Sequence, residues 1–243
     1  MVVEWEVTLE CNYNCFYCTN LDPSILPKDD IEGFIKMISE TYDVELFVFG
    51  GEPFVHPQIE YIIETLNKYK VDYVIQTNLS KKSVHVMNRI AEPFKINVSV
   101  HPTEVSREVI VECFNKVPDN VQVKTVDVMY TGKEAIDYYI DVKDFGDTYL
   151  TPIADFGDGI SGKILEEYNA MRHTPIWNKV IRFEDIKKMG EWRSDLWENF
   201  SPKGKPCLYY NEHFLYGPNL ELYNCCYREK HDGTCKHDKC FLM

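Results

Sequence analysis

The sequence predicts an α/β protein in which a parallel sheet with helices outside it is followed by a small cysteine-rich module. Three observations support this fold class. Strand-like and helix-like segments alternate six times along the first part of the chain. The alternation stops in the glycine-containing stretch ADFGDGISGK, near residue 160. The nine cysteines are clustered, three between residues 11 and 18 and five from residue 207 onward.

Each expected strand carries apolar residues either at alternate positions or in a short buried run. The first strand covers residues 3–9, where apolar residues alternate with polar or acidic ones. Five further strands are expected at residues 44–50, 72–78, 95–101, 120–130 and 147–153.

Helices are expected between these strands, because apolar residues there recur at helical spacing. The segments are residues 31–38, 59–66 and 81–91, a stretch ending near Val111, and residues 133–141. Such repeats form a parallel sheet whose ligands gather at the carboxyl ends of the strands. Periodicity alone leaves open whether the sheet is a curved, partly closed barrel or a flat, doubly wound sheet.

Composition limits the functional classes. The chain has 243 residues, of which 44% are hydrophobic and 27% charged, as in ordinary globular proteins. No apolar run approaches the roughly 20 residues that span a bilayer, and the first residues lack the pattern of a secretory signal. The net charge of -13 disfavours nucleic acid and anionic membranes as partners. We therefore expect a cytoplasmic protein, in which clustered cysteines more often hold metal than form disulfides.

The first cysteine cluster has the spacing C-x3-C-x2-C and follows the first strand directly. Cys11, Cys15 and Cys18 can hold three irons of a 4Fe–4S cluster and leave the fourth iron open to a ligand. A closed zinc site is the alternative, but it requires four ligands, and no further Cys or His follows within about twenty residues.

This segment, including the aromatic Tyr17 before the third cysteine, resembles the signature of the radical S-adenosylmethionine (radical SAM) superfamily. The resemblance implies a partial (β/α)6 TIM-like barrel over residues 1–159. It also implies that S-adenosylmethionine (SAM) binds the open iron. One electron from the cluster would cleave SAM to methionine and a 5′-deoxyadenosyl radical, which abstracts a hydrogen from the substrate. In such enzymes the cofactor supplies the chemistry and the protein supplies orientation.

A second motif, Gly50-Gly51-Glu52-Pro53, follows the second strand. The resemblance implies that this segment binds the amino group of SAM through its backbone and its acidic residue. Glycines let the main chain approach a ligand closely, and an anion suits an ammonium group.

The polar face of the fourth strand is a third candidate region. Ile96, Val98 and Val100 share one face, so Ser99 and His101 share the other, which we expect to line the barrel. The resemblance places Ser99 at the ribose of SAM and His101 near the substrate, as a candidate catalytic residue. A structural histidine is the alternative for His101.

Two neighbouring strands add weaker candidates. Asn78 ends the third strand and is expected to line the cofactor cavity, with Leu79 where the family often has glycine. On the fifth strand, alternation predicts that Lys124 and Asp127 point to opposite faces, so that only one faces the cavity. Lys124 is the second candidate catalytic residue. Cys113 is expected to pack inside a helix.

The C-terminal segment, residues 160–243, is expected to form a metal-stapled module, since so short a segment buries little core unaided. Aromatic residues around Gly217 and Asn219 predict a β-hairpin. The pattern resembles the twitch or SPASM-type extension of some radical SAM enzymes, which binds an auxiliary 4Fe–4S cluster. The expected ligands are Cys207, Cys225, Cys235 and Cys240, with Cys226 as the alternative to Cys225.

Zinc is the alternative for this module. Cys225 or Cys226, together with Cys235, His237 and Cys240, would make a closed site with three cysteines and one histidine. Thiolates outnumber histidines here, which favours the iron–sulfur cluster.

The function expected from these motifs is radical SAM oxidoreductase chemistry. The enzyme would dehydrogenate a small molecule or a short peptide segment, with the auxiliary cluster accepting an electron. Flavodoxin or ferredoxin would act as the electron donor. One alternative is a non-oxidative radical SAM enzyme, similar to glycyl-radical activases or carboxy-deazaguanine synthases, with structural zinc in the tail. The other is a non-enzymatic iron–sulfur or zinc-binding scaffold or electron carrier.

Overall fold

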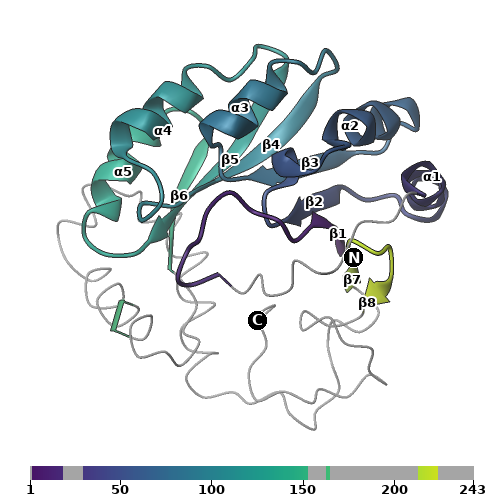
Figure 1. Cartoon of the computed structure of the whole chain (residues 1–243), viewed down its shortest axis with the longest axis horizontal. Coiled ribbons are helices and arrows are strands. Elements are labelled where there is room, and N and C mark those ends of the chain that lie inside the picture. The colour runs from purple at the N-terminus through teal and green to yellow at the C-terminus, as the bar shows by residue number, and fades with distance from the viewer. Residues whose placement is uncertain (1, 19–29, 153–162, 165–212, 224–243) are drawn as a thin grey trace, which may run out of the picture.

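The computed structural model describes residues 2–18, 30–152, 163–164 and 213–223 of the chain, and the architecture is clear in these residues (Figure 1). They form one eight-stranded sheet with the order β6-β5-β4-β3-β2-β1-β7-β8. The strands are β1 (Val2–Thr8), β2 (Leu46–Gly50), β3 (Tyr73–Thr77), β4 (Phe94–Val100), β5 (Val121–Tyr130), β6 (Asp147–Pro152), β7 (His213–Tyr216) and β8 (Leu222–Tyr223).

Six of these strands confirm the predicted parallel sheet. Strands β1 to β6 lie side by side in the order of the sequence, and each pairs in parallel with the next. A doubly wound sheet reverses its strand order near the middle. The sequential order therefore excludes that alternative and agrees with a partial TIM-like barrel.

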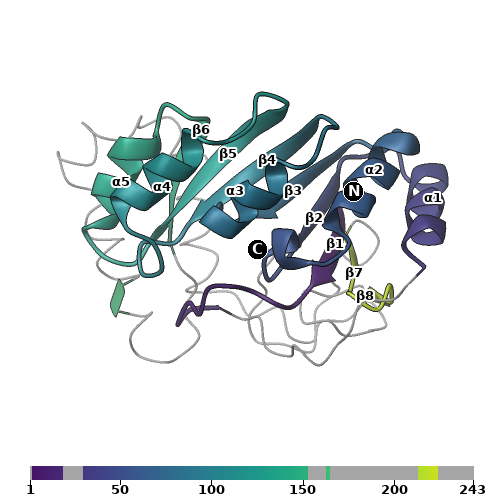
Figure 2. The same cartoon turned by 45° about the horizontal axis from the view of Figure 1, so that its top comes forward.

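The helices lie on one side of this sheet, as Figures 1 and 2 show. They are α1 (Ile31–Thr41), the short 3-10 helix η1 (Pro53–Val55), α2 (Ile59–Lys68), α3 (Lys81–Met87), α4 (Arg107–Phe114) and α5 (Ala135–Val142). Side chains that accept backbone hydrogen bonds fix three of the helix starts: Asp30 for α1, Ser80 for α3 and Ser106 for α4. Within the described residues, no helix is long and apolar enough to cross a membrane.

The predicted helix over residues 81–91 is shorter than expected. It ends at Met87 because the side chain of Asn88 turns back and donates to the carbonyl oxygen of Val84. The same amide donates to the carbonyl of Lys116 after α4, so it ties the ends of two neighbouring helices together.

The two faces of the sheet differ sharply in polarity. The helix-facing side chains of the central strands are fully or almost fully buried and form the main core, among them Val3, Trp5, Leu46, Val48, Ile75, Ile96, Val98, Val100, Val126 and Val128. The opposite face carries polar residues at the intervening positions, including Gln76, Asn97, Ser99, Thr125 and Asp127. The predicted division of β4 into an apolar and a polar face is thus confirmed, and none of the described helices lies on the polar face.

One irregularity overturns a prediction for β5. The register between β4 and β5 shifts after Ile96, so that Asn97 lies opposite Thr125 and Lys124 is skipped. An extra residue in a strand resets the alternation of its side chains. As a result Lys124 lies on the same face as Asp127, and the expectation that they point to opposite faces is wrong.

The predicted hairpin around Gly217 is confirmed and has a further role. Strand β7 pairs in parallel with β1 and so extends the main sheet, while β8 pairs antiparallel with β7. The ring of Tyr216 lies 5.0 Å from that of Phe34, and its hydroxyl lies 2.9 Å from that of Tyr42. The hairpin thus packs against α1 as well as pairing with β1.

Candidate functional site

The three N-terminal cysteines lie on a loop at the carboxyl ends of the strands. The loop leaves β1 and runs along the side of the sheet that the helices leave open (Figure 2). Contacts to three neighbouring strand ends hold it. The amides of Gly51 and Glu52 donate to the carbonyls of Thr8 and Glu10, both at 2.8 Å. Further along, the amide of Asn14 donates to Glu104 after β4, at 3.1 Å.

The glycine pair after β2 is required by this docking. A Cβ atom on Gly50 would lie 2.1 Å from the carbonyl oxygen of Thr8, and one on Gly51 would lie 2.1 Å from that of Glu10. Gly50 also has a φ of 138°, which L side chains rarely adopt. Both glycines therefore let the chain pass closely against the start of the cysteine loop, a reason that the sequence alone did not indicate.

The carboxylate of Glu52 is buried completely within this region. One oxygen accepts from the amide of Phe54 (3.1 Å) and the hydroxyl of Thr77 (2.8 Å), and the other accepts from the amide of Asn78 (2.7 Å). Burial raises the pKa of Glu52 to about 6, although these hydrogen bonds act in the opposite direction. In this arrangement Glu52 joins β2 to the end of β3, and Pro53 begins η1 beside it.

Asn78 connects the end of β3 to the cysteine loop. Its side-chain amide nitrogen donates to Asn12, at 3.0 Å, and lies 3.8 Å from the sulfur of Cys11. The following residue, Leu79, has a φ of 48° and is fully buried. This is the position where the resemblance led us to expect glycine, and the backbone keeps a glycine-like conformation although the residue is leucine.

His101 lies directly under the same loop. Its Nδ1 atom is 2.8 Å from the hydroxyl of Tyr17 and 3.5 Å from the sulfur of Cys15. The ring also stacks on Tyr17, with ring centroids 6.0 Å apart, and meets the edge of Tyr13. Burial lowers the pKa of His101 to about 4, so the imidazole is neutral at physiological pH. Tyr17 is only 8% exposed and is held by His101.

The three thiols of the loop are suitable ligands for an iron–sulfur cluster. Cys11 and Cys18 are exposed and Cys15 is half-buried. Burial chiefly raises the pKa of Cys15 to about 12, and the nearby Glu104, Cys18 and Cys11 add to the rise. The thiols are thus electrostatic neighbours, yet among the described residues no three Cys, His, Asp or Glu converge on one metal ion. A 4Fe–4S cluster takes one thiolate for each iron that the protein binds, and this short loop carries three thiols, so the residues present fit such a cluster with one iron left open.

The open face of the sheet carries the remaining candidate cofactor residue. Ser99 accepts a hydrogen bond of 2.6 Å from the side chain of Gln76 on β3. Next to it, Asn97 is only 9% exposed, and its buried Oδ1 atom has no hydrogen-bond partner among the described residues. On the other side Asp127 accepts from Thr151, at 3.0 Å. These groups give the face below the cysteine loop a polar surface.

Lys124, predicted as catalytic, lies elsewhere. Its ammonium group contacts both oxygens of Glu45, at 2.8 and 2.9 Å. Glu45 precedes β2, and Lys95 near the start of β4 pairs with it too. This ion cluster lies toward the amino ends of the strands, whereas the cysteine loop lies at their carboxyl ends. The structure therefore does not bring Lys124 together with the other candidates, and a catalytic role finds no support in its position.

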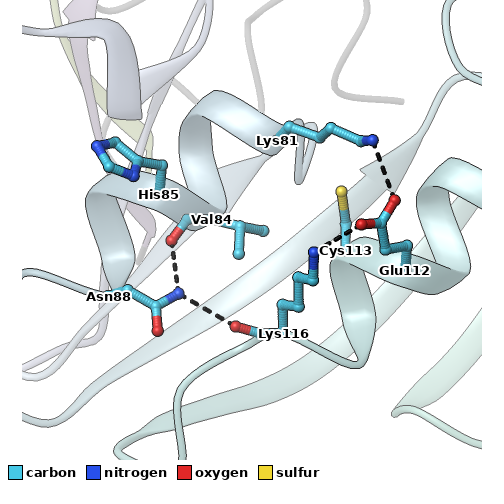
Figure 3. A pocket seen from close by; sticks show the side chains of 7 residues that line it. All are labelled: Lys81, Val84, His85, Asn88, Glu112, Cys113 and Lys116. Carbon is cyan, nitrogen blue, oxygen red and sulfur yellow. Dashed lines mark hydrogen bonds and ion pairs between the residues drawn. The ribbon is translucent and has the colours of Figure 1, made fainter.

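A separate pocket of about 440 Å³ lies on the helix side, between α3 and α4 (Figure 3). Its charges pair with one another, because Glu112 contacts both Lys81 (3.0 Å) and Lys116 (2.6 Å). Cys113 points into it and is 2% exposed, in agreement with its predicted packing in a helix. Cys113 is also an electrostatic neighbour of Tyr13, which lies in the cysteine loop.

Several sequence predictions fall outside the described residues. They concern the second cysteine cluster: Cys207, Cys225, Cys226, Cys235, His237 and Cys240. Conversely, the structure adds Asn12, Thr77 and Glu104, which the sequence analysis did not single out. Only their position next to a motif could have indicated them, since Asn, Thr and Glu are common at strand ends.

Comparisons with known proteins identify the family of the chain. The model of the Radical SAM superfamily matches residues 5–146, more than half of the chain. A probable GTP 3',8-cyclase of Thermococcus kodakarensis is 29% identical over 106 residues, which are 39% of this chain and 33% of that protein. GTP 3',8-cyclase of Helicobacter pylori is 28% identical over 113 residues, 42% of this chain and 35% of that protein. The chain thus matches about a third of the length of these relatives.

Solved structures of low sequence identity share the fold. Native anSMEcpe with bound AdoMet and the Cp18Cys peptide has a TM-score of 0.55 at 14% identity, covering 98% of this chain and 76% of that one. Streptococcus suis SuiB has a TM-score of 0.53 at 13% identity, covering 97% of this chain and 62% of that one. The cysteine loop and the GGEP segment both lie within the matched residues 5–146, and the chain belongs to the radical SAM superfamily.

Proposed function

We propose that this protein is a radical SAM enzyme that dehydrogenates a small molecule or a short peptide segment. The observation that carries the proposal is the docking of the C-x3-C-x2-C loop on the GGEP segment and on the ends of β3 and β4. A 4Fe–4S cluster on Cys11, Cys15 and Cys18 would supply the electron that cleaves SAM and so generates a radical able to abstract hydrogen.

The residues of this chain position the reactants. Gly50 and Gly51 bring the backbone next to the loop, and Glu52 holds that backbone to β3. The exposed thiols of Cys11 and Cys18 leave room for SAM beside the cluster. The polar face around Gln76 and Ser99 offers hydrogen-bonding groups to the ribose and to a polar substrate.

The oxidative subclass rests on the second cysteine cluster. Cys207, Cys225 or Cys226, Cys235 and Cys240 would hold an auxiliary 4Fe–4S cluster in a twitch-like module and accept the second electron. Flavodoxin or ferredoxin would reduce the first cluster. Structural zinc on Cys225 or Cys226, Cys235, His237 and Cys240 is the competing proposal for this module.

A second candidate is a cyclisation without net oxidation. The relatives named GTP 3',8-cyclase favour it. A triphosphate requires cationic partners. Within the described residues, the two lysines that β4 and β5 contribute to the open face, Lys95 and Lys124, already pair with Glu45. We rank this candidate second because the match covers only 33% and 35% of the length of these relatives.

The test combines metal analysis with SAM cleavage. Anaerobically reconstituted protein is compared with a Cys11/Cys15/Cys18→Ala triple variant and with Cys113→Ala, a matched control buried in α4. We expect about eight irons per chain in wild type and control and about four in the triple variant. With dithionite as reductant, only the proteins with the intact loop should form 5′-deoxyadenosine.

The other outcomes decide between the alternatives. Four irons per chain in wild type and none in the triple variant, with one zinc retained in both, would favour a non-oxidative radical SAM enzyme. Consumption of GTP together with formation of 5′-deoxyadenosine would favour the cyclase. Two intact clusters without any cleavage of SAM would contradict the proposal and would indicate a non-enzymatic electron carrier.

A further inference from the structure

The side chain of Asn78 has its orientation fixed by four contacts. Its Oδ1 atom accepts from the amide of Ser80 (3.0 Å) and from the hydroxyl of Ser83 (3.4 Å). These two donors require an acceptor, so the amide nitrogen must point the other way. There it donates to Asn12, at 3.0 Å, and lies 3.8 Å from the sulfur of Cys11.

The backbone of Asn78 is fixed as well. Its amide donates to the buried carboxylate of Glu52, at 2.7 Å. The side chain is 5% exposed, so solvent does not compete for its donors. A buried and fully partnered amide keeps a single orientation, because leaving any of these groups without a partner would cost free energy.

The sulfur of Cys11 thus receives two N–H groups. One comes from the backbone of Tyr13, at 3.4 Å, and the other from Asn78. Hydrogen bonds to the sulfur atoms of an iron–sulfur cluster stabilise its reduced, more negative form and so raise its reduction potential. The side-chain donor comes from β3, which is distant from the cysteine motif in sequence.

We propose that Asn78 is a positioning residue that holds Cys11 and raises the reduction potential of the cluster by donating a hydrogen bond to its sulfur. This inference rests on the proposed function, since it requires the cluster on Cys11, Cys15 and Cys18. It goes beyond the expectation that Asn78 lines the cofactor cavity, because its partner is a cluster ligand.

Two substitutions isolate the donor. Asn78→Asp keeps the shape and the acceptor for Ser80 and Ser83 but replaces the donor with an oxygen. Asn78→Leu removes the donor without adding charge. Asn88→Asp and Asn88→Leu are matched controls at the other end of α3, where the amide donates only to backbone carbonyls far from the loop.

The measurement is a redox titration of the full-length, reconstituted proteins, followed by electron paramagnetic resonance. The signal that changes when SAM is added identifies the relevant cluster. At the midpoint potential of the wild type, we expect the ratio of reduced to oxidised cluster to fall about tenfold in both Asn78 variants, which is about 59 mV for one electron. The Asn88 variants should keep the wild-type midpoint.

Each other outcome has a defined meaning. Wild-type midpoints in both Asn78 variants would overturn the inference, and so would a shift in Asn78→Asp alone, which would reflect the added charge. Loss of iron from both Asn78 variants, while the Asn88 controls load normally, would make Asn78 a residue for cluster assembly and also overturn it. A wild-type protein without a SAM-responsive cluster would instead contradict the proposed function itself.

Discussion

At the scale of single residues, Glu52 combines two requirements that usually conflict. Its carboxylate is removed completely from water, which disfavours charge, yet three groups donate hydrogen bonds to it and favour charge. The balance raises its pKa to about 6. Glu52 is therefore charged at neutral pH at a cost in stability, and it holds β2, β3 and the start of η1 together.

The pH dependence of stability tests this description of Glu52. The folded-state pKa of about 6 exceeds the ordinary value of 4.5, so folded protein binds the proton more tightly and loses stability as pH rises through this window. Relative to Glu52→Gln, wild type should lose roughly 1–2 kcal/mol between pH 4.5 and 7. Urea unfolding of cluster-free protein measures the difference.

The control for this prediction is Glu64→Gln, which removes an exposed carboxylate from α2. It shows how much of any pH dependence arises from the loss of a carboxylate in general rather than from the loss of the buried one. A constant difference for Glu52→Gln would show that the buried carboxylate titrates at its ordinary value.

Lys124 allows a second prediction at this scale. Its ion pair with Glu45 lies toward the amino ends of the strands, away from the cysteine loop. Lys124→Met should therefore leave the rate of 5′-deoxyadenosine formation within about threefold of wild type and cost at most about 1 kcal/mol of stability. A loss of cleavage by a factor of a hundred or more, in a folded variant with full iron content, would restore Lys124 to the catalytic machinery.

At the scale of elements, the strands were predictable and their irregularities were not. Alternation in β1 and the apolar run in β2 follow from burial of one or both faces, so the sequence alone locates them. The bulge at Lys124 leaves no such pattern, because it depends on pairing with β4. The positive φ of Leu79 is equally hidden, since leucine rarely adopts it and only the surrounding core stabilises it there.

The candidate site also has parts that the sequence predicted and parts that it did not. The cysteine loop and GGEP could be found because both motifs are contiguous in the sequence. The contacts of Asn78 with Cys11 and of His101 with Tyr17 join residues that lie far apart along the chain. Alternation along a strand predicts the face on which a side chain lies but not the distant residue that it contacts. These contacts could therefore be found only from the structure.

The hairpin offers a prediction for a whole element. The hydroxyls of Tyr42 and Tyr216 pair at 2.9 Å, which fastens β7 to the end of α1. Tyr42→Phe and Tyr216→Phe should each lower the free energy of unfolding by about 1 kcal/mol, because each leaves one hydroxyl without its partner. The double variant should cost clearly less than the sum. Strict additivity would mean that the two hydroxyls do not interact.

At the scale of the whole molecule, the two faces of the sheet differ in the residues that they carry. Among the described residues, the helices cover one face and bury the apolar core, while the opposite face and the carboxyl ends of the strands carry the polar residues and the loop with Cys11, Cys15 and Cys18. The sequential strand order makes this separation possible, because every crossover helix lies on the same side.

The joining of β7 to β1 leads to the last prediction, which concerns the division of the chain at residues 159 and 160. A fragment of residues 1–159 lacks β7, so β1 becomes an edge with unpaired backbone groups, and Phe34 loses its contact with Tyr216. Exposed edges of this kind promote association between chains. We therefore expect the fragment to aggregate or to unfold without cooperativity, as size-exclusion chromatography and thermal circular dichroism would show. A monomeric fragment that unfolds cooperatively would instead establish residues 1–159 as an independent domain.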